Sequence, residues 1–364
     1  MKHLNTYITE YIIKKKLDKP IDSSGYKYYP KTKEELIKNI DELISNQKYN
    51  FNCIDTSAIT DMSLLFANTK QLRDVNFNVS DWNVSNVKNM AFMFSNCKNF
   101  DCDLSDWNMS NVNKTSHMFQ NCQNFTGKGL ENWDVSNVSD FCAMFQYCAK
   151  LEGKEIENWD LTNAKTMHGM FIGCYKLNCN LNNWDVSNVK DMKFMFSYCE
   201  NFDSDLSKWN VSNVTDATNM FDNCQNFTGK GLDKWDVSNV VDFGAMFQSC
   251  AKFKGKEIEN WDLKNAKNMH GMFIGCYKLN CNLNNWDVSN VENMKQMFKW
   301  CEVFDSDLSN WNVSNVTNMM AMFDWCKYFT GKGLENWNVS NVTDMNVMFE
   351  YCFNLKNKPS WYKY

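Results

Sequence analysis

The residues with the greatest chemical potential in this chain are cysteines that recur at a fixed spacing. Eleven of the sixteen cysteines share one register, each three residues after a phenylalanine. Thiolates are nucleophiles and metal ligands, so a regular column of thiols could serve as a redox or metal-binding array. The column consists of Cys97, Cys122, Cys148, Cys174, Cys199, Cys224, Cys250, Cys276, Cys301, Cys326 and Cys352.

The surrounding pattern favours packing over that chemistry. No Cys-x-x-Cys pair occurs, and four histidines are too few for a zinc site in every repeat. Each column cysteine instead continues an apolar stripe, where a free thiol behaves as a small buried hydrophobe. Disulfides between neighbouring repeats and a metal array are the alternatives, and unpaired thiols favour a reducing compartment.

Histidine and aspartate offer weaker candidates. His168 and His270 stand 102 residues apart in identical "MHGMFIGC" stretches, and no acid that would orient them recurs beside them. Three acidic pairs could suggest calcium but lack a glycine-rich loop, which favours solvated loops. These pairs are Asp101 and Asp103, Asp203 and Asp205, and Asp305 and Asp307. No phosphate-binding loop or nucleophile–base–acid set appears, so we expect no enzyme activity, no metal and no cofactor.

The elements that must position these residues are the coils of a repeat. A tryptophan returns every 25 or 26 residues, and a degenerate first copy begins at Ile54. There is also a longer period of 102 residues, because "NFTGKGLENWDVSNV" from Asn124 returns as "NFTGKGLDKWDVSNV" from Asn226. We infer that a block of four coils was duplicated and that the coils stack. The tryptophans are Trp82, Trp107, Trp133, Trp159, Trp184, Trp209, Trp235, Trp261, Trp286, Trp311 and Trp337.

One coil can be interpreted from Trp184 to Cys199, "WDVSNVKDMKFMFSYC". Trp184 and Val186 alternate with polar residues, which predicts a short strand with one buried face. From Val189 the apolar residues follow at steps of three, three, one and three, which predicts a short helix with one apolar stripe. We expect the strands of successive coils to pair in parallel.

An asparagine column lies at the turn between the two predicted elements. Stacked asparagines could satisfy the backbone groups of these turns from coil to coil. The column consists of Asn86, Asn111, Asn137, Asn163, Asn188, Asn213, Asn239, Asn265, Asn290, Asn315 and Asn341.

The predicted fold is an α/β repeat solenoid, similar to a leucine-rich repeat, with about twelve coils of 25–26 residues. Each coil would hold a short parallel strand and a short helix. The predicted N-terminal cap contains helices at Leu4–Leu17 and Lys33–Ser45, the second opened by a capping box from Thr32 to Glu35. The expected parts are a helical cap at 1–49, the solenoid at 50–353 and a capping tail at 354–364.

Charge and hydropathy limit the classes of partner that we expect. The net charge is −5, from 43 acidic and 38 basic residues, and Arg73 is the single arginine, so a dedicated nucleic-acid binder is not expected. No apolar run approaches the length of a membrane-spanning helix, and the N-terminus lacks the continuous apolar core of a secretory signal. We therefore expect no membrane insertion and a cytoplasmic or viral setting.

The repeated pattern "F-x₃-L-x₂-W-D/N-V-S-N-V-x₂-M-x₂-M-F-x₂-C" resembles a known family. It is similar to the BspA-like leucine-rich-repeat surface proteins, in the subgroup called domain of unknown function 285 or mycoplasma-lipoprotein repeats. The resemblance covers about residues 50 to 355. It implies a leucine-rich-repeat-like solenoid, adhesion or protein binding without enzymatic activity, and a surface location. It also implies that the segment before the first repeat, from Tyr29 to Ile44, is a helix.

The residues at the surface vary from coil to coil, because the repeat does not fix them. The residue before the column cysteine is Trp300, Trp325 and Tyr351 in three consecutive coils, and Tyr198 in the copy that matches Trp300. Three stacked exposed aromatics would mark an interface. The alternative is that they cover the C-terminal end of the core together with Phe353, Trp361 and Tyr362. On the strand face, the residues after each tryptophan would form a mildly acidic stripe that includes Asp185, Asp236 and Asp287.

We therefore expect a non-enzymatic repeat scaffold that binds another macromolecule, most simply a protein, through the strand face or the C-terminal aromatic patch. The first alternative is a structural protein that self-assembles in a viral particle or surface layer, so a homo-oligomer stays open. The second is a metal or redox array of cysteines.

Overall fold

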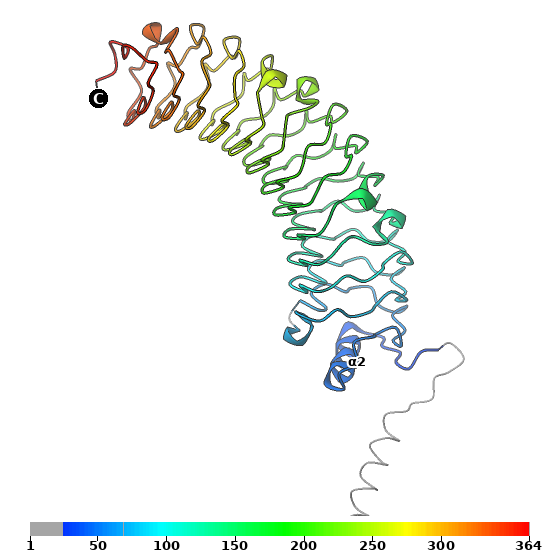
Figure 1. The fold of residues 1–364 in the computed structure, drawn as a ribbon. Helices are drawn as coiled ribbons and strands as arrows, with labels where there is room; N and C mark the ends of the chain where they lie inside the picture. The colour runs from blue at the N-terminus through cyan, green and yellow to red at the C-terminus, as the bar shows by residue number, and fades with distance from the viewer. Residues whose placement is uncertain (1–24, 68, 364) are drawn as a thin grey trace, which may run out of the picture.

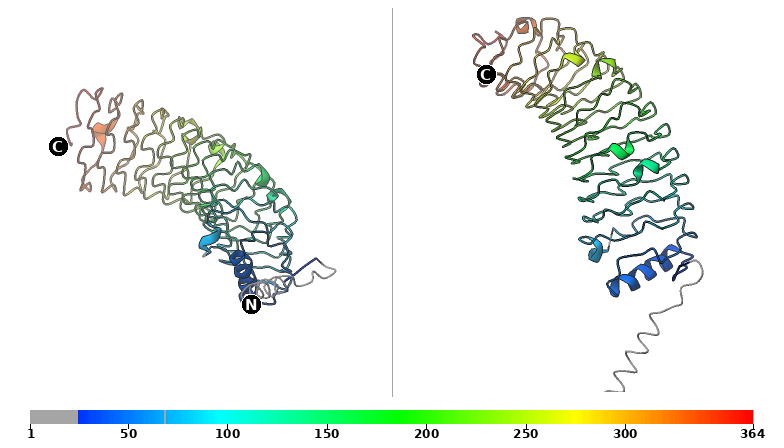
Figure 2. Two further views of the ribbon diagram at one scale, coloured as in Figure 1. Left: turned by 60° about the horizontal axis from the view of Figure 1, so that its bottom comes forward. Right: turned by 45° about the vertical axis from the view of Figure 1, so that its right-hand side comes forward.

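The chain winds into stacked coils that form a curved solenoid. The computed structural model describes residues 25–67 and 69–363. Helix α2 (Lys33–Ser45) lies at the N-terminal end of the arc, and the C-terminus lies at the other end (Figures 1 and 2). Short 3₁₀ turns interrupt some coils, and η2 to η6 lie along the convex edge in Figure 1. Their bounds are η1 Lys70–Leu72, η2 Leu130–Asn132, η3 Lys154–Ile156, η4 Leu232–Lys234, η5 Lys256–Ile258 and η6 Leu334–Asn336.

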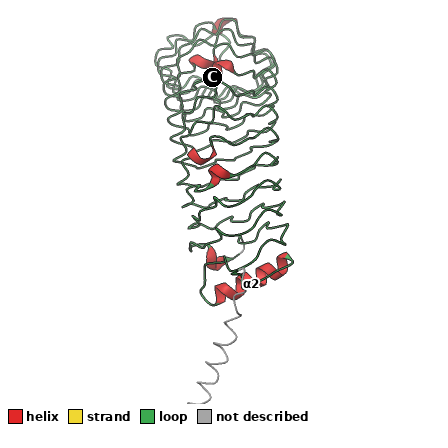
Figure 3. Cartoon of the chain, turned by 90° about the vertical axis from the view of Figure 1, so that its right-hand side faces the viewer, coloured by secondary structure: helices red, strands yellow, loops and turns green. Residues whose placement is uncertain are grey.

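The coils themselves are built from turns. In the described part of the chain no regular strand forms, and no helix after α2 exceeds three residues (Figure 3). The prediction of a strand and a helix in every coil is therefore wrong. Parallel pairing of successive coils is confirmed, but as isolated bridges at one position per coil, such as that between Asp191 and Asp216.

The "WDVSNV" segment forms two successive turns instead of a strand. The Asp185 carboxylate accepts a hydrogen bond from the backbone N–H of Ser187 at 2.9 Å, which is an Asx turn. The N–H of Val189 then donates to the carbonyl of Val186 at 2.9 Å. The apolar–polar alternation that predicts a strand here arises from these turns.

The apolar stripe lies on stacked turns instead of a helix. Met195 donates its N–H to the carbonyl of Met192, three residues back, while Phe194 donates to Thr218 in the next coil at 2.9 Å. N–H groups thus point alternately within the coil and toward its neighbour, whereas a helix keeps all of them within one segment. The left-handed φ values of 58° at Phe194 and 62° at Tyr198 also exclude a helix.

Aromatic ladders fill the core and accompany the curvature. The phenylalanines that precede the column cysteines stack from coil to coil with ring centroids 5.4–5.8 Å apart. Stacked tryptophans lie 6.2–6.5 Å apart. Trp133, Trp235 and Trp337 directly follow η2, η4 and η6, which lie on the convex edge in Figure 1. The wider spacing therefore belongs to the ladder whose residues follow the turns of the convex edge.

Helix α2 has the predicted bounds. The Thr32 hydroxyl accepts a hydrogen bond from the N–H of Glu35 at 3.3 Å, and the Glu35 carboxylate accepts from the N–H of Lys31 at 2.7 Å. The second bond of the capping box thus reaches one residue further back than predicted. The predicted helix at Leu4–Leu17 lies outside the described residues. Within those residues, no helix combines the length and apolar character that crossing a membrane requires.

Candidate functional site

The cysteine column is part of the core. Every column cysteine is buried, and all sixteen cysteines are free thiols. Cys199 is typical, because its thiol donates a hydrogen bond to the carbonyl of Phe171 in the preceding coil at 3.1 Å. Burial raises the pKa of the Cys97 and Cys352 thiols to about 12. Because metal binding and redox chemistry need the thiolate, these environments favour the predicted packing role.

Two other ladders complete the frame that holds the coils in register. The indole N–H of Trp184 donates to the carbonyl of Ile156 in the preceding coil at 2.9 Å. The side-chain amide of Asn188 donates to the carbonyl of Thr162 at 2.8 Å. The same bonds recur along both columns, so the predicted role of the asparagines is confirmed. Each bond satisfies a backbone carbonyl that the turns leave open.

The three histidines among the described residues, His117, His168 and His270, do not assemble a thiol-based site. Cys142 Sγ lies 3.9 Å from Nε2 of His117, whose ring stacks on Phe92 with centroids 4.3 Å apart. Burial raises the pKa of Cys142 to about 11 and lowers the pKa of His117, so both groups stay neutral near pH 7. His168 does lie beside an acid, because its Nδ1 is 3.5 Å from Asp191.

The aspartates predicted on the strand face are exposed, but each one accepts a hydrogen bond within its own turn. Asp185, Asp236 and Asp287 each accept the N–H of the serine two residues later at 2.9–3.0 Å. Hydrogen bonds from the hydroxyl and N–H of that serine lower the pKa of each carboxyl group. They lie two coils apart in sequence, and each one closes the first turn of its own coil.

The predicted aromatic residues lie at the surface. Trp300 is 42% exposed and Tyr351 is 46% exposed, while Trp325 is half-buried. The rings of Trp325 and Tyr351 contact each other with centroids 4.4 Å apart. Trp361 and Tyr362, by contrast, pack against the core. The tail and the exposed aromatics are therefore two separate groups of residues.

Sequence reasoning missed Val303 and Tyr328, and it named Phe353 only as part of a possible cover for the core. Val303, Tyr328 and Phe353 lie one or two residues after a column cysteine and are 38%, 57% and 70% exposed. The Tyr351 and Phe353 rings meet edge to face at 6.3 Å. The same column comparison, carried two residues further, would have found them. We call the full set the aromatic edge: Trp300, Val303, Trp325, Tyr328, Tyr351 and Phe353.

The duplicated blocks provide an internal comparison for this edge. Core positions are kept across the 102-residue period, as with Phe221 and Phe323, whereas the edge positions change from mostly polar to apolar. The residues 102 positions before the aromatic edge are Tyr198, Asn201, Asn223, Asn226, Ser249 and Ala251. The residues 204 positions before it are Asn96, Asn99, Asn121, Asn124, Tyr147 and Ala149.

Backbone conformation makes part of this change unfavourable for the fold. Trp300, Trp325 and Tyr351 have φ values of 63°, 62° and 55°, in the left-handed region. Asparagine tolerates that region, but a bulky L-residue there costs about 1–2 kcal/mol. Asn121 and Asn223 fill the Trp325 position in the two earlier blocks. The last coils therefore carry exposed aromatics where the backbone favours asparagine.

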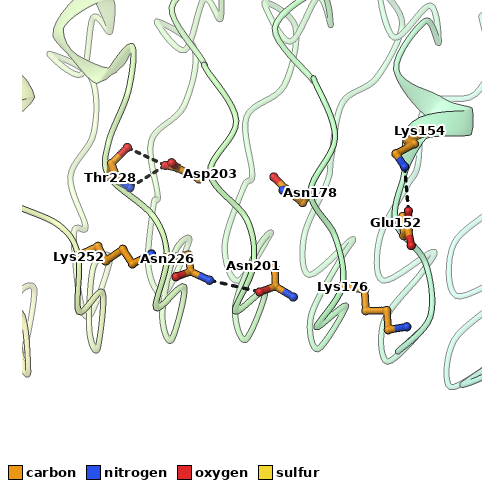
Figure 4. A pocket seen from close by; sticks show the side chains of 9 residues that line it. All are labelled: Glu152, Lys154, Lys176, Asn178, Asn201, Asp203, Asn226, Thr228 and Lys252. Carbon is orange, nitrogen blue, oxygen red and sulfur yellow. Dashed lines mark hydrogen bonds and ion pairs between the residues drawn. The ribbon is translucent and has the colours of Figure 1, made fainter.

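A polar groove of about 640 Å³ crosses the middle coils (Figure 4). Lys176, Asn201, Asn226 and Lys252 lie in a row along its tight loops, and each is the second residue after a column cysteine. Tyr328 occupies the same column in the aromatic edge.

These ladders define the protein as a repeat solenoid whose coil interior is devoted to packing and register. The family model described as "Mycoplasma protein of unknown function, DUF285" matches residues 35–154, 140–257 and 242–362, and the chain belongs to this family. The predicted resemblance is thereby confirmed.

No curated protein matches the sequence. Among solved structures, the chain is similar to "Plant peptide hormone receptor RGFR1 in complex with RGF2", at 11% identity and a TM-score of 0.22. That alignment covers 80% of this chain and 47% of the other, so this chain spans about half the length of its match.

Proposed function

We propose that this protein is a non-enzymatic scaffold that binds a protein partner through its aromatic edge. The observation that carries the proposal is the contrast between repeated blocks. The interior of the coil is copied, while exposed aromatics replace asparagine, serine or alanine at several edge positions of the last coils. Clustered exposed tryptophan and tyrosine side chains are the typical anchors of protein interfaces.

Two lysines that contact the tryptophan rings also support the aromatic edge as the binding surface. The Lys299 ammonium lies 4.9 Å from the ring centroid of Trp300, and that of Lys327 lies 5.4 Å from Trp325. Lys299 is also held by the buried carboxylate of Asp324 at 2.7 Å. These contacts fix the rings against the scaffold, which lowers the entropy that a partner must remove on binding.

The test exchanges the edge for its own counterpart 102 residues earlier. The swap variant combines Trp325→Asn, Tyr328→Asn, Tyr351→Ser and Phe353→Ala, which are residues that the same scaffold already carries. Tagged wild-type protein captures candidate partners from the source cells, and each candidate is purified and titrated against both proteins. We expect the swap to weaken binding at least about tenfold, since it removes several interface anchors.

A matched control removes exposed apolar residues away from the edge, with Ile37→Ser and Val241→Ser, which are 38% and 39% exposed. This control should bind like wild type. Equal affinity of wild type and the swap variant for every partner would contradict the proposal. Sedimentation of both proteins identifies a second copy as the partner if wild type self-associates and the swap variant stays monomeric.

A further inference from the structure

Four lysines share the column that runs into the aromatic edge. In the described part of the chain none of the four forms an ion pair, whereas Lys154, Lys299 and Lys327 each lie 2.7–3.0 Å from a carboxylate. Unpaired ammonium groups keep their attraction for an incoming anion. The four are Lys150, Lys176, Lys252 and Lys278.

The polar groove presents two of these lysines to one ligand. Lys176 and Lys252 lie at opposite ends of the row in Figure 4. Two acids also line the groove, but Glu152 is paired with Lys154 at 3.0 Å. Asp203 accepts the N–H and the hydroxyl of Thr228, at 2.8 and 2.7 Å. Three lysines and two carboxylates line the groove in total, so its net charge is +1.

The groove and the aromatic edge lie on one continuous surface. The column stands two residues after the column cysteines, whose thiols donate to the preceding coil, as Cys250 does to the carbonyl of Phe221 at 3.1 Å and Cys326 to that of Phe298 at 3.0 Å. This thiol ladder keeps the column in register from the groove to the last coils. Along it, lysine and asparagine give way to Val303 and Tyr328.

We propose that the partner binds as an extended acidic peptide. Its carboxylates would pair with Lys176 and Lys252, and its apolar end would lie on the aromatic edge. This inference rests on the function proposed above and names the partner's chemistry. Lys176 and Lys252 are three coils apart, about 14 Å at the usual spacing of paired chains, which an extended peptide covers in about four residues.

A peptide fits this surface better than a chain of sugars. Sugars bind on open, flat ring faces, but Trp325 and Tyr351 cover each other with centroids 4.4 Å apart. Lys299 and Lys327 occupy further space over Trp300 and Trp325. These contacts reduce the open ring surface on which a sugar could stack, whereas apolar side chains can also contact ring edges.

The experiment uses the full chain and fluorescein-labelled synthetic peptides of about twelve extended residues, long enough to span groove and edge. The test peptide carries two acidic residues four positions apart, followed by a Leu/Phe segment. One comparison peptide replaces the acids with lysine, a second replaces them with serine, and a third keeps the acids but lacks the apolar segment. Fluorescence polarisation gives Kd at low and high salt.

The lysine variant combines Lys176→Asn and Lys252→Asn, the residue type that Asn201 and Asn226 already supply to this column. Its control removes two exposed lysines elsewhere, with Lys234→Asn and Lys264→Asn. We expect the lysine variant to bind the test peptide about five- to tenfold more weakly at low salt, with the difference lost at high salt. The control should bind like wild type, and the lysine-bearing peptide should not bind.

Three outcomes overturn the inference. They are equal binding of the acidic and lysine peptides, no effect of the lysine variant, and no binding of the test peptide at about 1 mM. Preferential binding of a heparin hexasaccharide in a Lys176- and Lys252-dependent manner would assign the groove to glycans instead. If the lysine variant weakens partner binding and the aromatic swap does not, the proposed binding through the aromatic edge is wrong. If only the aromatic swap weakens binding, that function is supported and the proposal of an acidic partner is wrong.

Discussion

The indole ring of Trp361 stacks on that of Trp337, with centroids 6.2 Å apart and planes 10° from parallel. Its N–H donates to the carbonyl of Leu334 at 2.8 Å, as each earlier tryptophan does to the coil before it. The tail thus ends the tryptophan ladder with one more ring. The 24-residue step from Trp337 is the sequence signal for this role.

Removing this terminal ring should loosen the last coils. We expect Trp361→Ala to cost about 2 kcal/mol, because the ring is half-buried and its neighbours cannot close the gap. Stability in a solenoid is largely a nearest-neighbour sum, so hydrogen exchange should rise after Trp337 and stay unchanged around Trp184. Trp361→Phe, which keeps an aromatic ring but loses the indole N–H, should cost about half as much stability as Trp361→Ala. A uniform change along the chain would contradict this.

The asparagine column makes a second prediction. Asn213 donates to the carbonyl of Ser187 at 2.6 Å, and Asn213→Ala should cost about 1 kcal/mol in the free energy of unfolding. Asn213→Asp should cost more at pH 7 than at pH 3, since an ionised carboxylate would face a carbonyl and only its protonated form can donate. Urea unfolding at both pH values measures this. An aspartate variant as stable as wild type at pH 7 would show that the bond is dispensable.

Two glycines with similar φ should respond differently to alanine. At Gly231, with φ 91°, an added Cβ would collide with the backbone nitrogen of Ser207. At Gly275, with φ 70°, the nearest atom would be the Ser249 hydroxyl at 3.6 Å. We expect Gly231→Ala to cost about 3 kcal/mol or more and Gly275→Ala about 1 kcal/mol. Thermal unfolding of both variants measures the difference. Equal losses of stability would mean that the cost comes from the positive φ and not from the collision of the added Cβ.

The sequence predicted stacking and burial better than local conformation. The period of 25–26 residues, the buried cysteines and the asparagine bonds follow directly from residue type and spacing. The predicted helix was wrong because stacked turns with bonds three residues back place Met192, Met195, Phe196 and Cys199 on one face, as a helix would. Nothing in that stripe reveals which N–H groups point to the next coil.

A signal against the helix was present in neighbouring coils. Gly169 and Gly173 occupy the two left-handed positions of one coil, and Asn219 and Asn223 occupy them in another. These are the residue types that tolerate positive φ. The exposed aromatics were found from the same columns, and the residues that this chain presents define the chemistry of a partner without naming the partner protein.

The buried thiols predict a loss of stability at alkaline pH. Burial raises the pKa of Cys97 and Cys352 to about 12 from 9.0, so the folded state holds protons that the unfolded state releases above pH 9. Stability is fully present below pH 9 and falls between pH 9 and about 12, by about 1.4 kcal/mol per pH unit for each thiol. Urea unfolding between pH 8 and 10 should show this slope, and Cys199→Ala should reduce it by one thiol. An unchanged slope in that variant would contradict burial as the cause.

The aromatic edge should be nearly neutral for the fold. Trp325→Asn relieves a left-handed φ of 62° at a bulky residue, a gain of about 1–2 kcal/mol. It also removes the contacts with Tyr351 and Lys327, a loss of about 1–2.5 kcal/mol together. We therefore expect the free energy of unfolding to change by less than about 1 kcal/mol, against a loss of about 3–5 kcal/mol for Phe323→Ala in the core. Urea unfolding of both variants measures this. A loss above about 2 kcal/mol for Trp325→Asn would instead make the edge a cover for the last coils, because binding residues should be dispensable to the scaffold that presents them.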